Sequence, residues 1–358
     1  MIMRNVLTVL AAYLMFAAPC VTAAPWHPSA WPSLTTYDSE HLQRVALPLG
    51  GIGTGSVSLG GRGELRDWEI MNVPGKGYST VTDGNDAPFF AIYTRRESGE
   101  TATRMLAGPL YPQEYLHCEG RPVNHHGLPR FRNASFEAAY PFGQVSLRDD
   151  AMPVKVRIKG FNPLIPGDTD ASSLPIAVLS YEVTNVSGET VEVSVCGSIR
   201  NFIGKDGREV GSNWKGDFIP TGEKDNLNEY RENAGPGLRG LYFYSEKVNA
   251  RHPAWGNFSL VTDSDQEVSY RTFSVDNAWA NSVLNFWDDF SDDGLISNPE
   301  ASIRHTVGGD DDPMGSLAVK SSLAPGETRV FNFYLTWNFP NRIAWAWDNF
   351  IVGNHYST

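Results

Sequence analysis

Apolar residues occupy every second position in several short stretches of this 358-residue chain. The alternation is strict in Val154–Lys159 and Val191–Val195, and in Val330–Trp337 a large apolar residue recurs at every second position from Phe331 onward. Because successive strand residues point to opposite faces, these stretches predict strands with one buried and one solvated face. Less regular runs occur at Leu241–Ser245, Phe258–Thr262, Val268–Phe273 and Leu317–Ser321. We therefore predict an all-β fold, a large antiparallel β-sandwich of two packed sheets with long loops and one or two short helices.

Two turn segments lie between consecutive runs. Asn185–Gly188 and Ala324–Glu327 carry the Asn, Gly and Pro residues that tight turns favour, and we expect both to close hairpins. The chain is 41% hydrophobic and holds 34 Gly and 23 Pro, which is enough for a large core and for many turns.

One segment has helical rather than strand periodicity. Val283, Phe286, Trp287 and Phe290 follow the spacing i, i+3, i+4 and i+7, which predicts a helix with an aromatic face. We expect this helix to plug the sandwich. An interface with a second domain is the alternative, because Trp and Phe often anchor interfaces.

Two polar stretches are predicted to be loops. Gly204–Leu238 has few apolar residues, and we expect a long surface excursion near a partner domain, packed through Trp214 and Phe218. Ser297–Met314 has a similar composition, and its Asp310–Asp312 run lacks the spacing of an EF-hand. A solvated loop is favoured there over a calcium site.

Glycine is concentrated in Ala46–Lys76, where seven glycines fall within the eighteen residues before Arg66. Their spacing does not match the dinucleotide fingerprint, the phosphate-binding loop or the nucleophile elbow. Glycine at every second position from Gly51 to Gly55 leaves one strand face without side chains. A tight hairpin is the favoured interpretation, and a flat ligand-binding face is the alternative.

The same segment resembles a known family. Leu47–Ser56, followed by Gly61–Trp68 and Asn72, is similar to the signature of glycoside hydrolase family 116, the non-lysosomal glucosylceramidase or β-glucosidase type. Further similar motifs follow in the family's order at Tyr140–Phe142, Met152–Val156, Gly160–Pro166, Ser173–Ala177, Tyr181–Asn185, Leu323–Glu327, Phe333–Trp337 and Phe339–Asn341. The resemblance implies an N-terminal β-sandwich followed by an (α/α)6 barrel that holds a Glu nucleophile and an Asp acid/base. Those carboxylates would lie beyond Thr358, so no catalytic residue is expected in this chain.

The resemblance and the N-terminal composition suggest three segments. Residues 1–23 are predicted to be a signal peptide, since Arg4 precedes an apolar run and small residues precede Ala24, which implies a secreted or periplasmic protein. Residues 24–340 are the predicted sandwich, and residues 341–358 begin a linker toward a missing C-terminal helical catalytic domain. We expect a truncated gene product, a split enzyme or a partial record.

The tail and the net charge limit the partners. Aromatic residues of the tail, including Trp345, Trp347 and Phe350, are expected to be exposed unless a partner covers them. A net charge of −12 disfavours nucleic acid, while a neutral sugar is compatible. After residue 23, no apolar run is long enough to predict a membrane span.

Five residues are candidates for a substrate entrance or a domain interface: Arg62, Glu64, Arg66, Trp68 and Trp287. Two of the neighbouring carboxylates Glu64, Asp67 and Glu69 could form a catalytic pair, since a retaining glycosidase needs two carboxyl groups about 5 Å apart. On a regular strand, however, Asp67 and Glu69 share a face and Glu64 lies opposite. We expect Arg62 and Arg66 to form structural ion pairs with them.

The sequence predicts neither a cofactor nor a metal site. Adjacent His125 and His126 would point in opposite directions on a strand, and no further ligand pattern accompanies them. Beyond the signal peptide only Cys118 and Cys196 remain, which are predicted to be two buried thiols, with a disulfide as the alternative. Formal glycosylation sequons begin at Asn133, Asn185 and Asn257.

Three functions remain open from the sequence. The first is a non-catalytic N-terminal domain of a secreted β-glucosidase or glucosylceramidase-like enzyme. It would support the helical domain in cis, or in trans if the enzyme is split, with a β-glucoside or glycolipid at the shared interface. The second is a stand-alone carbohydrate-binding or interaction module that uses Trp26, Trp31, Trp214 or Trp255 as stacking platforms. The third is an independently catalytic hydrolase.

Overall fold

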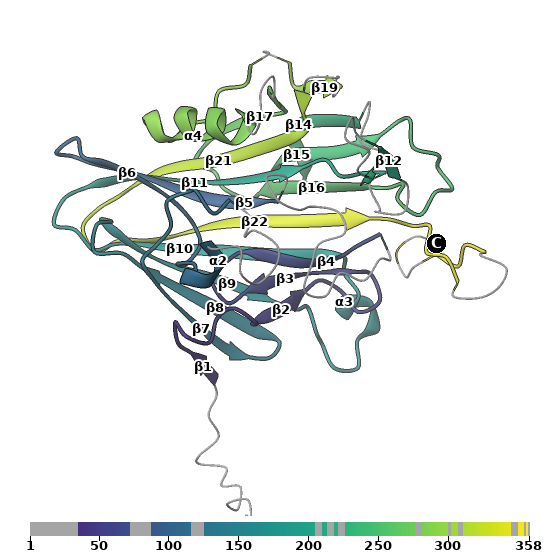
Figure 1. The fold of residues 1–358 in the computed structure, drawn as a ribbon, viewed down its shortest axis with the longest axis horizontal. Helices are drawn as coiled ribbons and strands as arrows, with labels where there is room; N and C mark the ends of the chain where they lie inside the picture. The colour runs from purple at the N-terminus through teal and green to yellow at the C-terminus, as the bar shows by residue number, and fades with distance from the viewer. Residues whose placement is uncertain are drawn as a thin grey trace, which may run out of the picture. The chain divides into compact units, whose positions relative to one another are not determined.

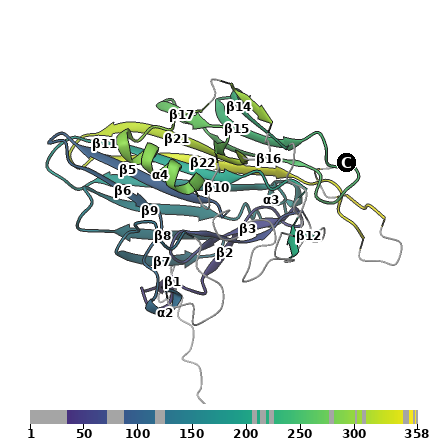
Figure 2. The same ribbon diagram turned by 45° about the horizontal axis from the view of Figure 1, so that its top comes forward.

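A computed structural model describes residues 35–71, 87–115, 125–204, 210–212, 218–220, 226–275, 281–299, 302–306, 311–344, 350–353 and 356. Antiparallel strands dominate them (Figures 1 and 2). The largest sheet has ten strands in the spatial order β1 (Thr35–Tyr37), β7 (Asn133–Ala139), β8 (Phe142–Arg148), β9 (Val154–Phe161), β10 (Ile176–Asn185), β22 (Thr328–Asn338), β16 (Asn257–Thr262), β15 (Leu238–Ser245), β14 (Asn226–Gly235) and β19 (Arg304–Thr306).

Smaller sheets and three short helices complete the described fold. A five-stranded sheet has the order β17 (Glu267–Arg271), β21 (Met314–Leu323), β11 (Val191–Arg200), β5 (Phe89–Arg96) and β6 (Thr101–Met105). A three-stranded sheet joins β2 (Ala46–Leu49), β3 (Ser56–Gly60) and β4 (Leu65–Glu69), and two-stranded ribbons pair β12 (Val210–Ser212) with β13 (Phe218–Pro220) and β18 (Ser274–Val275) with β20 (Asp311–Asp312). The helices are α2 (Pro112–Tyr115), α3 (Thr169–Ser172) and α4 (Asn281–Asp293).

The main core lies between the ten-stranded sheet on one side and the five-stranded and three-stranded sheets on the other. The predicted alternation is confirmed, since every second residue is buried in β9 and, from Phe331 to Trp337, in β22. Phe90 of β5 stacks on Tyr181 of β10 with ring centroids 4.9 Å apart and meets Phe333 of β22 edge-on at 5.3 Å. These rings join the two principal sheets, and the all-β sandwich prediction is confirmed.

Helix α4 has the predicted buried face, but it does not plug the sandwich. Phe286 and Phe290 are buried in a second cluster with Phe89, Tyr93 and Cys196. Those partners alternate along β5 and β11 with residues of the main core, so α4 covers the outer face of the five-stranded sheet (Figure 1). Helical periodicity defines the buried face of α4 but not the surface that receives it.

The two predicted hairpins are wrong, because both turns pass between sheets. β10 and β11 belong to different sheets, as do β21 and β22. Instead, β10 pairs with β22 and β11 pairs with β21. The turns at Asn185–Gly188 and Ala324–Glu327 are therefore corners of the sandwich, and we call this end, at the left of Figure 1, the corner end.

Both predicted loops contain strands. β14 lies inside Gly204–Leu238 and pairs with β15 and β19, and the rest of that stretch includes residues outside the described ranges. Asn226 and Asn228 are buried in β14. Because these buried residues are polar, the sequence of β14 does not show an alternation of apolar and polar residues. Within Ser297–Met314, β19 and β20 are strands, and the buried Asp312 pairs with Arg200 at 2.7 Å.

Candidate functional site

Residues 50–55 connect β2 to β3 at the end of the sandwich opposite the corners, on the right of Figure 1. We call them the glycine loop and this end the glycine-loop end. Antiparallel pairing of β2 with β3 confirms the predicted hairpin. Gly50, Gly53 and Gly55 have φ values of 121°, 74° and 95°, which residues with a Cβ rarely adopt.

The glycine loop encloses the indole ring of Trp337, near the end of β22. The Trp337 Nε1 donates to the carbonyl oxygen of Thr54 at 2.7 Å. A Cβ on Gly50 would lie 2.9 Å from the indole Cζ2, and one on Gly55 would lie 3.2 Å from its Nε1. Side chains at these two positions would therefore displace the ring.

The same loop is held against the chain beside α3. The Thr54 hydroxyl donates to the carbonyl of Ser173 at 2.9 Å, and the Ile52 amide donates to the carbonyl of Ser172 at 2.8 Å. The Asn162 amide group donates to the carbonyl of Gly50 at 2.9 Å. The backbone is thus fixed from several sides, while the side chain of Ile52 is 57% exposed.

The candidate Arg62 lies in a buried ion-pair cluster. Its Nη1 is 2.6 Å from Glu114 Oε2, and its Nη2 is 3.5 Å from Glu64 Oε1. Glu114 also accepts the Tyr111 amide at 2.7 Å, and the guanidinium carbon lies 5.7 Å from the centroid of the Tyr111 ring. Burial opposes the charge, but Glu64 and Glu114 outweigh it and hold the pKa of Arg62 above its usual value.

A β-bulge changes the predicted arrangement of the next charges. Ser58 pairs with Arg66 and Ser56 with Glu69, so β4 carries one extra residue between these pairs. Cross-strand partners share a face, which places Arg66 and Glu69 together, rather than Asp67 and Glu69 as the sequence suggested. Asp67 is buried with φ of 50°, and its carboxylate is 3.5 Å from Arg66 Nε. The predicted pairing of Arg62 with Glu64 and of Arg66 with a nearby carboxylate is confirmed.

The two candidate tryptophans have different surroundings. Trp68 is buried in the main core and meets Phe202 edge-on, with centroids 6.0 Å apart. Trp287 lies on α4, is partly buried, and packs against the second cluster, which contains Phe286 and Phe290. The structure thus brings Arg62 and Glu64 together at the turn between β3 and β4 and places Arg66 on β4 beside Asp67. Trp287 lies on the outer face of the five-stranded sheet.

Hydrogen bonds lower the pKa of five carboxyl groups. The main cause is a backbone amide for Glu189 and Glu327, and a side-chain partner for Asp38, Glu232 and Asp265. The general acid of a glycosidase needs a raised pKa, so these five groups do not fit that role.

Two of the histidine and cysteine side chains that the sequence singles out, those of His125 and Cys196, are buried. His125 is buried with its Nε2 2.7 Å from the carbonyl oxygen of Ala87, and His126 is exposed. No group of three or more His, Cys, Asp and Glu residues suited to a metal occurs within the described ranges. Cys196 is a free, buried thiol whose pKa is raised by burial, and Cys118 lies outside the described residues.

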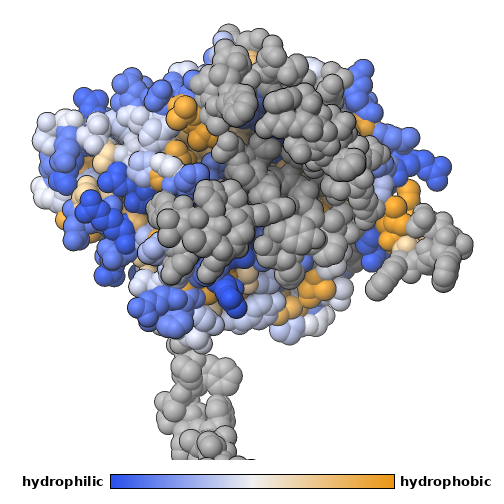
Figure 3. Space-filling view, viewed as in Figure 1, coloured by the Kyte–Doolittle hydropathy of each residue, from blue (hydrophilic) through white to orange (hydrophobic). Residues whose placement is uncertain are grey.

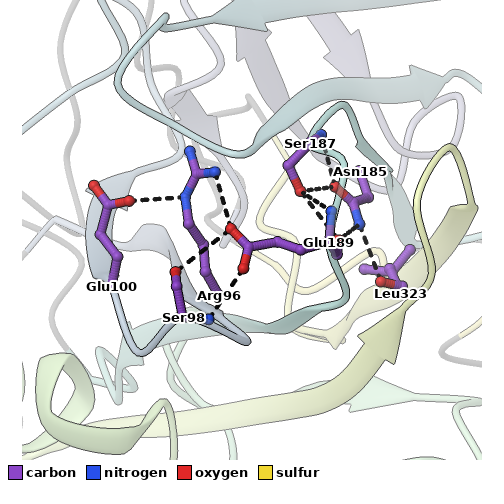
Figure 4. A network of polar contacts seen from close by, with 7 residues as sticks. All are labelled: Arg96, Ser98, Glu100, Asn185, Ser187, Glu189 and Leu323. Atoms are coloured by element: carbon purple, nitrogen blue, oxygen red, sulfur yellow. Dashed lines mark hydrogen bonds and ion pairs between the residues drawn. The ribbon is translucent and has the colours of Figure 1, made fainter.

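At the corner end, a polar network ties neighbouring turns together (Figure 4). The Asn185 Nδ2 donates to the carbonyls of Glu189 and Leu323 at 2.8 and 3.1 Å, and its Oδ1 accepts the Ser187 amide at 2.9 Å. Glu189 in turn bonds Arg96 and the Ser98 amide. Asn185 is buried, so its sequon is not accessible in the folded domain, whereas Asn133 is exposed.

Two open grooves lie along β8, β9 and the nearby corner. Their volumes are about 540 and 260 Å³, and they share Arg148 and Lys155. Among the described residues that line the two grooves, none is aromatic. Trp255 is partly buried, and Trp26, Trp31, Trp214, Trp345 and Trp347 lie outside the described residues. Among the described helices, none has the length and apolar character needed to cross a membrane.

Comparisons with known proteins identify the chain's relatives. The family model described as "beta-glucosidase 2, glycosyl-hydrolase family 116 N-term" matches residues 46–358. Among solved structures, a polysaccharide lyase is similar over 83% of this chain and 34% of its own, with 12% identity and a TM-score of 0.37. The family 36 α-galactosidase of Geobacillus stearothermophilus is similar over 82% of this chain and 41% of its own, with 10% identity and a TM-score of 0.34. The chain thus spans well under half the length of either.

Proposed function

The chain belongs to the N-terminal domain family of glycosyl-hydrolase family 116, and from this premise we propose that it is a non-catalytic β-sandwich that supports a separate catalytic domain. The catalytic partner is a helical domain that performs retaining hydrolysis of a β-glucoside or a glucosylceramide-like glycolipid. The partner follows in the same polypeptide, or associates in trans if the enzyme is split. The observation that carries this proposal is the family match over residues 46–358, which includes every strand of the two principal sheets except β1.

The charges of the described residues support a structural role. Glu64, Glu114, Asp67 and Asp149 each lie within ion-pair distance of an arginine. Each of these carboxylates thus has a cationic partner inside the domain. For Glu64 and Glu114, which surround the candidate Arg62, these contacts support a role in packing.

Assays of the chain alone and of the polypeptide that includes the helical domain test this proposal. We expect no turnover of an aryl β-glucoside by the chain alone and retained turnover by the longer polypeptide when Glu64 is changed to Gln. Glu182→Gln, on the outer face of β10, is the matched control. Turnover by the chain alone that Glu64→Gln or Glu114→Gln abolishes would contradict the proposal.

We also propose that residues 1–23 direct export and are removed. The basic residue, apolar run and small residues of this segment support a signal peptide. The N-terminus of the product recovered from a secreting host tests this: a mature protein that begins at Ala24 or Pro25 is expected, and a product that retains Met1 would contradict export by this signal.

A further inference from the structure

Exposed aliphatic side chains gather at the glycine-loop end. Ile52, Ile165 and Leu174 are 57%, 51% and 42% exposed, and we call them the aliphatic patch. Large exposed apolar side chains that occur singly need no explanation, but a group of them marks an interaction surface.

Hydrogen bonds through Ser172 and Ser173 join the three segments of the patch. The Ser172 carbonyl accepts the Ile52 amide at 2.8 Å. The Ser172 hydroxyl accepts the Ile165 amide at 2.9 Å and donates to the Ile165 carbonyl at 3.0 Å. Leu174 follows directly, and the carbonyl of Ser173 accepts the Thr54 hydroxyl. The three side chains are thus carried by one hydrogen-bonded unit.

This unit is rigid before any partner binds. Trp337 and Asn162 fix the glycine loop, and a Cβ on Gly51 would lie 2.2 Å from the carbonyl carbon of Ser173. A preorganised surface loses little conformational entropy on binding, so its exposed apolar area contributes more of its transfer free energy to affinity.

The C-terminal segment reaches the same end. Residues 342–344 and 350–353 pair through the bridge between Ile343 and Ile351. The Tyr356 hydroxyl then donates to the carbonyl of Asp170 in α3, directly beside the patch. Figure 1 shows this segment and α3 at the same side of the domain.

The C-terminal segment adds its own apolar surface. Half of the fourteen large exposed hydrophobic side chains in the described ranges lie in the patch and in this segment: Ile52, Ile165, Leu174, Phe350, Ile351, Val352 and Tyr356. Figure 3 shows hydrophobic surface on the right, near the position of α3 and on the C-terminal segment. The exposed aromatic tail expected from the sequence is confirmed at Phe350.

We propose that the aliphatic patch is the docking surface for the helical catalytic domain, an inference that rests on the proposed function. The segment that leads from the sandwich is tied to α3, so a domain that follows it in the same polypeptide starts beside the patch. Asp168 and Asp170 are exposed at the edge. The complementary face of the partner is therefore apolar, with Lys or Arg residues at its rim.

Hydrogen exchange of the polypeptide that contains both domains tests the patch directly. We expect the peptides around Ile52 and Leu174 to exchange at least about tenfold more slowly there than in the 358-residue chain alone. Ile52→Asp and Leu174→Asp should each abolish this protection and leave the melting temperature of the chain alone unchanged. Val186→Asp is the matched control, because Val186 is also 57% exposed but lies at the corner end.

The possible outcomes separate this inference from the proposed function. Equal exchange in the two proteins, or equal effects of Ile52→Asp and Val186→Asp, would overturn docking at the patch. Protection that appears in the chain alone and grows with its concentration would assign the patch to a second copy and also overturn it. A carboxylate substitution in this chain that abolishes turnover while the protection persists would instead refute the non-catalytic role alone.

Discussion

The main-chain amide of Asn185 donates a hydrogen bond to the carbonyl oxygen of Glu327 at 2.9 Å, which joins the two corners that pass between the sheets. The amide of Gly326 returns a bond to the carbonyl of Asn185 at 3.1 Å. With its side chain also bonded to Leu323, Asn185 holds both crossings at one point.

Replacing Asn185 should therefore destabilise the whole sandwich. Asn185→Ala removes the donors to Glu189 and Leu323 and leaves the buried Leu323 carbonyl without this partner, which we expect to cost about 2 to 4 kcal/mol in urea unfolding. Asn133→Ala, at an exposed position of β7, should cost less than about 0.5 kcal/mol. Similar losses for the two variants would mean that the corner is not held by this side chain.

Two glycines of one loop should respond differently to a methyl group. Gly51→Ala brings a Cβ within 2.2 Å of the Ser173 backbone, and we expect a loss of about 3 kcal/mol in unfolding free energy. A Cβ on Gly53 would have no atom within 4 Å, so we expect Gly53→Ala to lower the unfolding free energy by about 1 kcal/mol, through its positive φ alone. A larger loss for Gly53→Ala than for Gly51→Ala in thermal or urea unfolding would refute the close packing of the loop on Ser173.

The Arg62 cluster should show the cost of an unpaired buried charge. Arg62→Met leaves the carboxylate of Glu114 buried without its partner at 2.6 Å, and we expect a loss of about 3 to 5 kcal/mol. Adding Glu114→Gln should recover part of it. Arg157→Met, in the exposed pair with Glu182, should cost less than about 1 kcal/mol and serves as the control. A double variant no more stable than Arg62→Met would contradict the pairing.

The Cys196 thiol should resist alkylation until the domain unfolds. Burial raises the pKa of this thiol in the folded state, so little of the reactive thiolate is present. The unfolded thiol ionises more readily, so the free energy of unfolding falls as the pH rises above 9.0, the ordinary pKa of a cysteine. Site mapping by mass spectrometry after iodoacetamide treatment at pH 8 should show no label on Cys196 in the native domain and full label in guanidinium. Rapid native labelling would place this thiol in an open environment.

The strands with strict alternation were predictable because their pattern is local. β9 and β22 alternate as expected, and the face of α4 follows from the spacing of Phe286 and Phe290. The sequence does not indicate β14, because Asn226 and Asn228 occupy buried positions, where their side-chain amides donate hydrogen bonds that a hydrophobicity pattern does not register.

The predictions failed where the structure depends on pairing between strands that are far apart in the sequence. Turn residues are alike in hairpins and in corners, and only the pairing of β10 with β22 distinguishes them. The extra residue in β4 likewise becomes visible through its register with Ser56 and Ser58. At the candidate site, the glycine spacing predicted the hairpin, but nothing local to it pointed to Trp337 as the ring that the loop encloses.

β22 is the last strand of the sandwich along the chain, yet it lies inside the ten-stranded sheet, between β10 and β16. On a translating ribosome, the inner edges of β10 and β16 cannot be closed until residues through Asn338 have emerged. Until then the nascent chain presents two open sheet edges, the feature through which β proteins aggregate. Synthesis that stalls shortly before Thr328 would leave most of the domain made but its largest sheet divided in two.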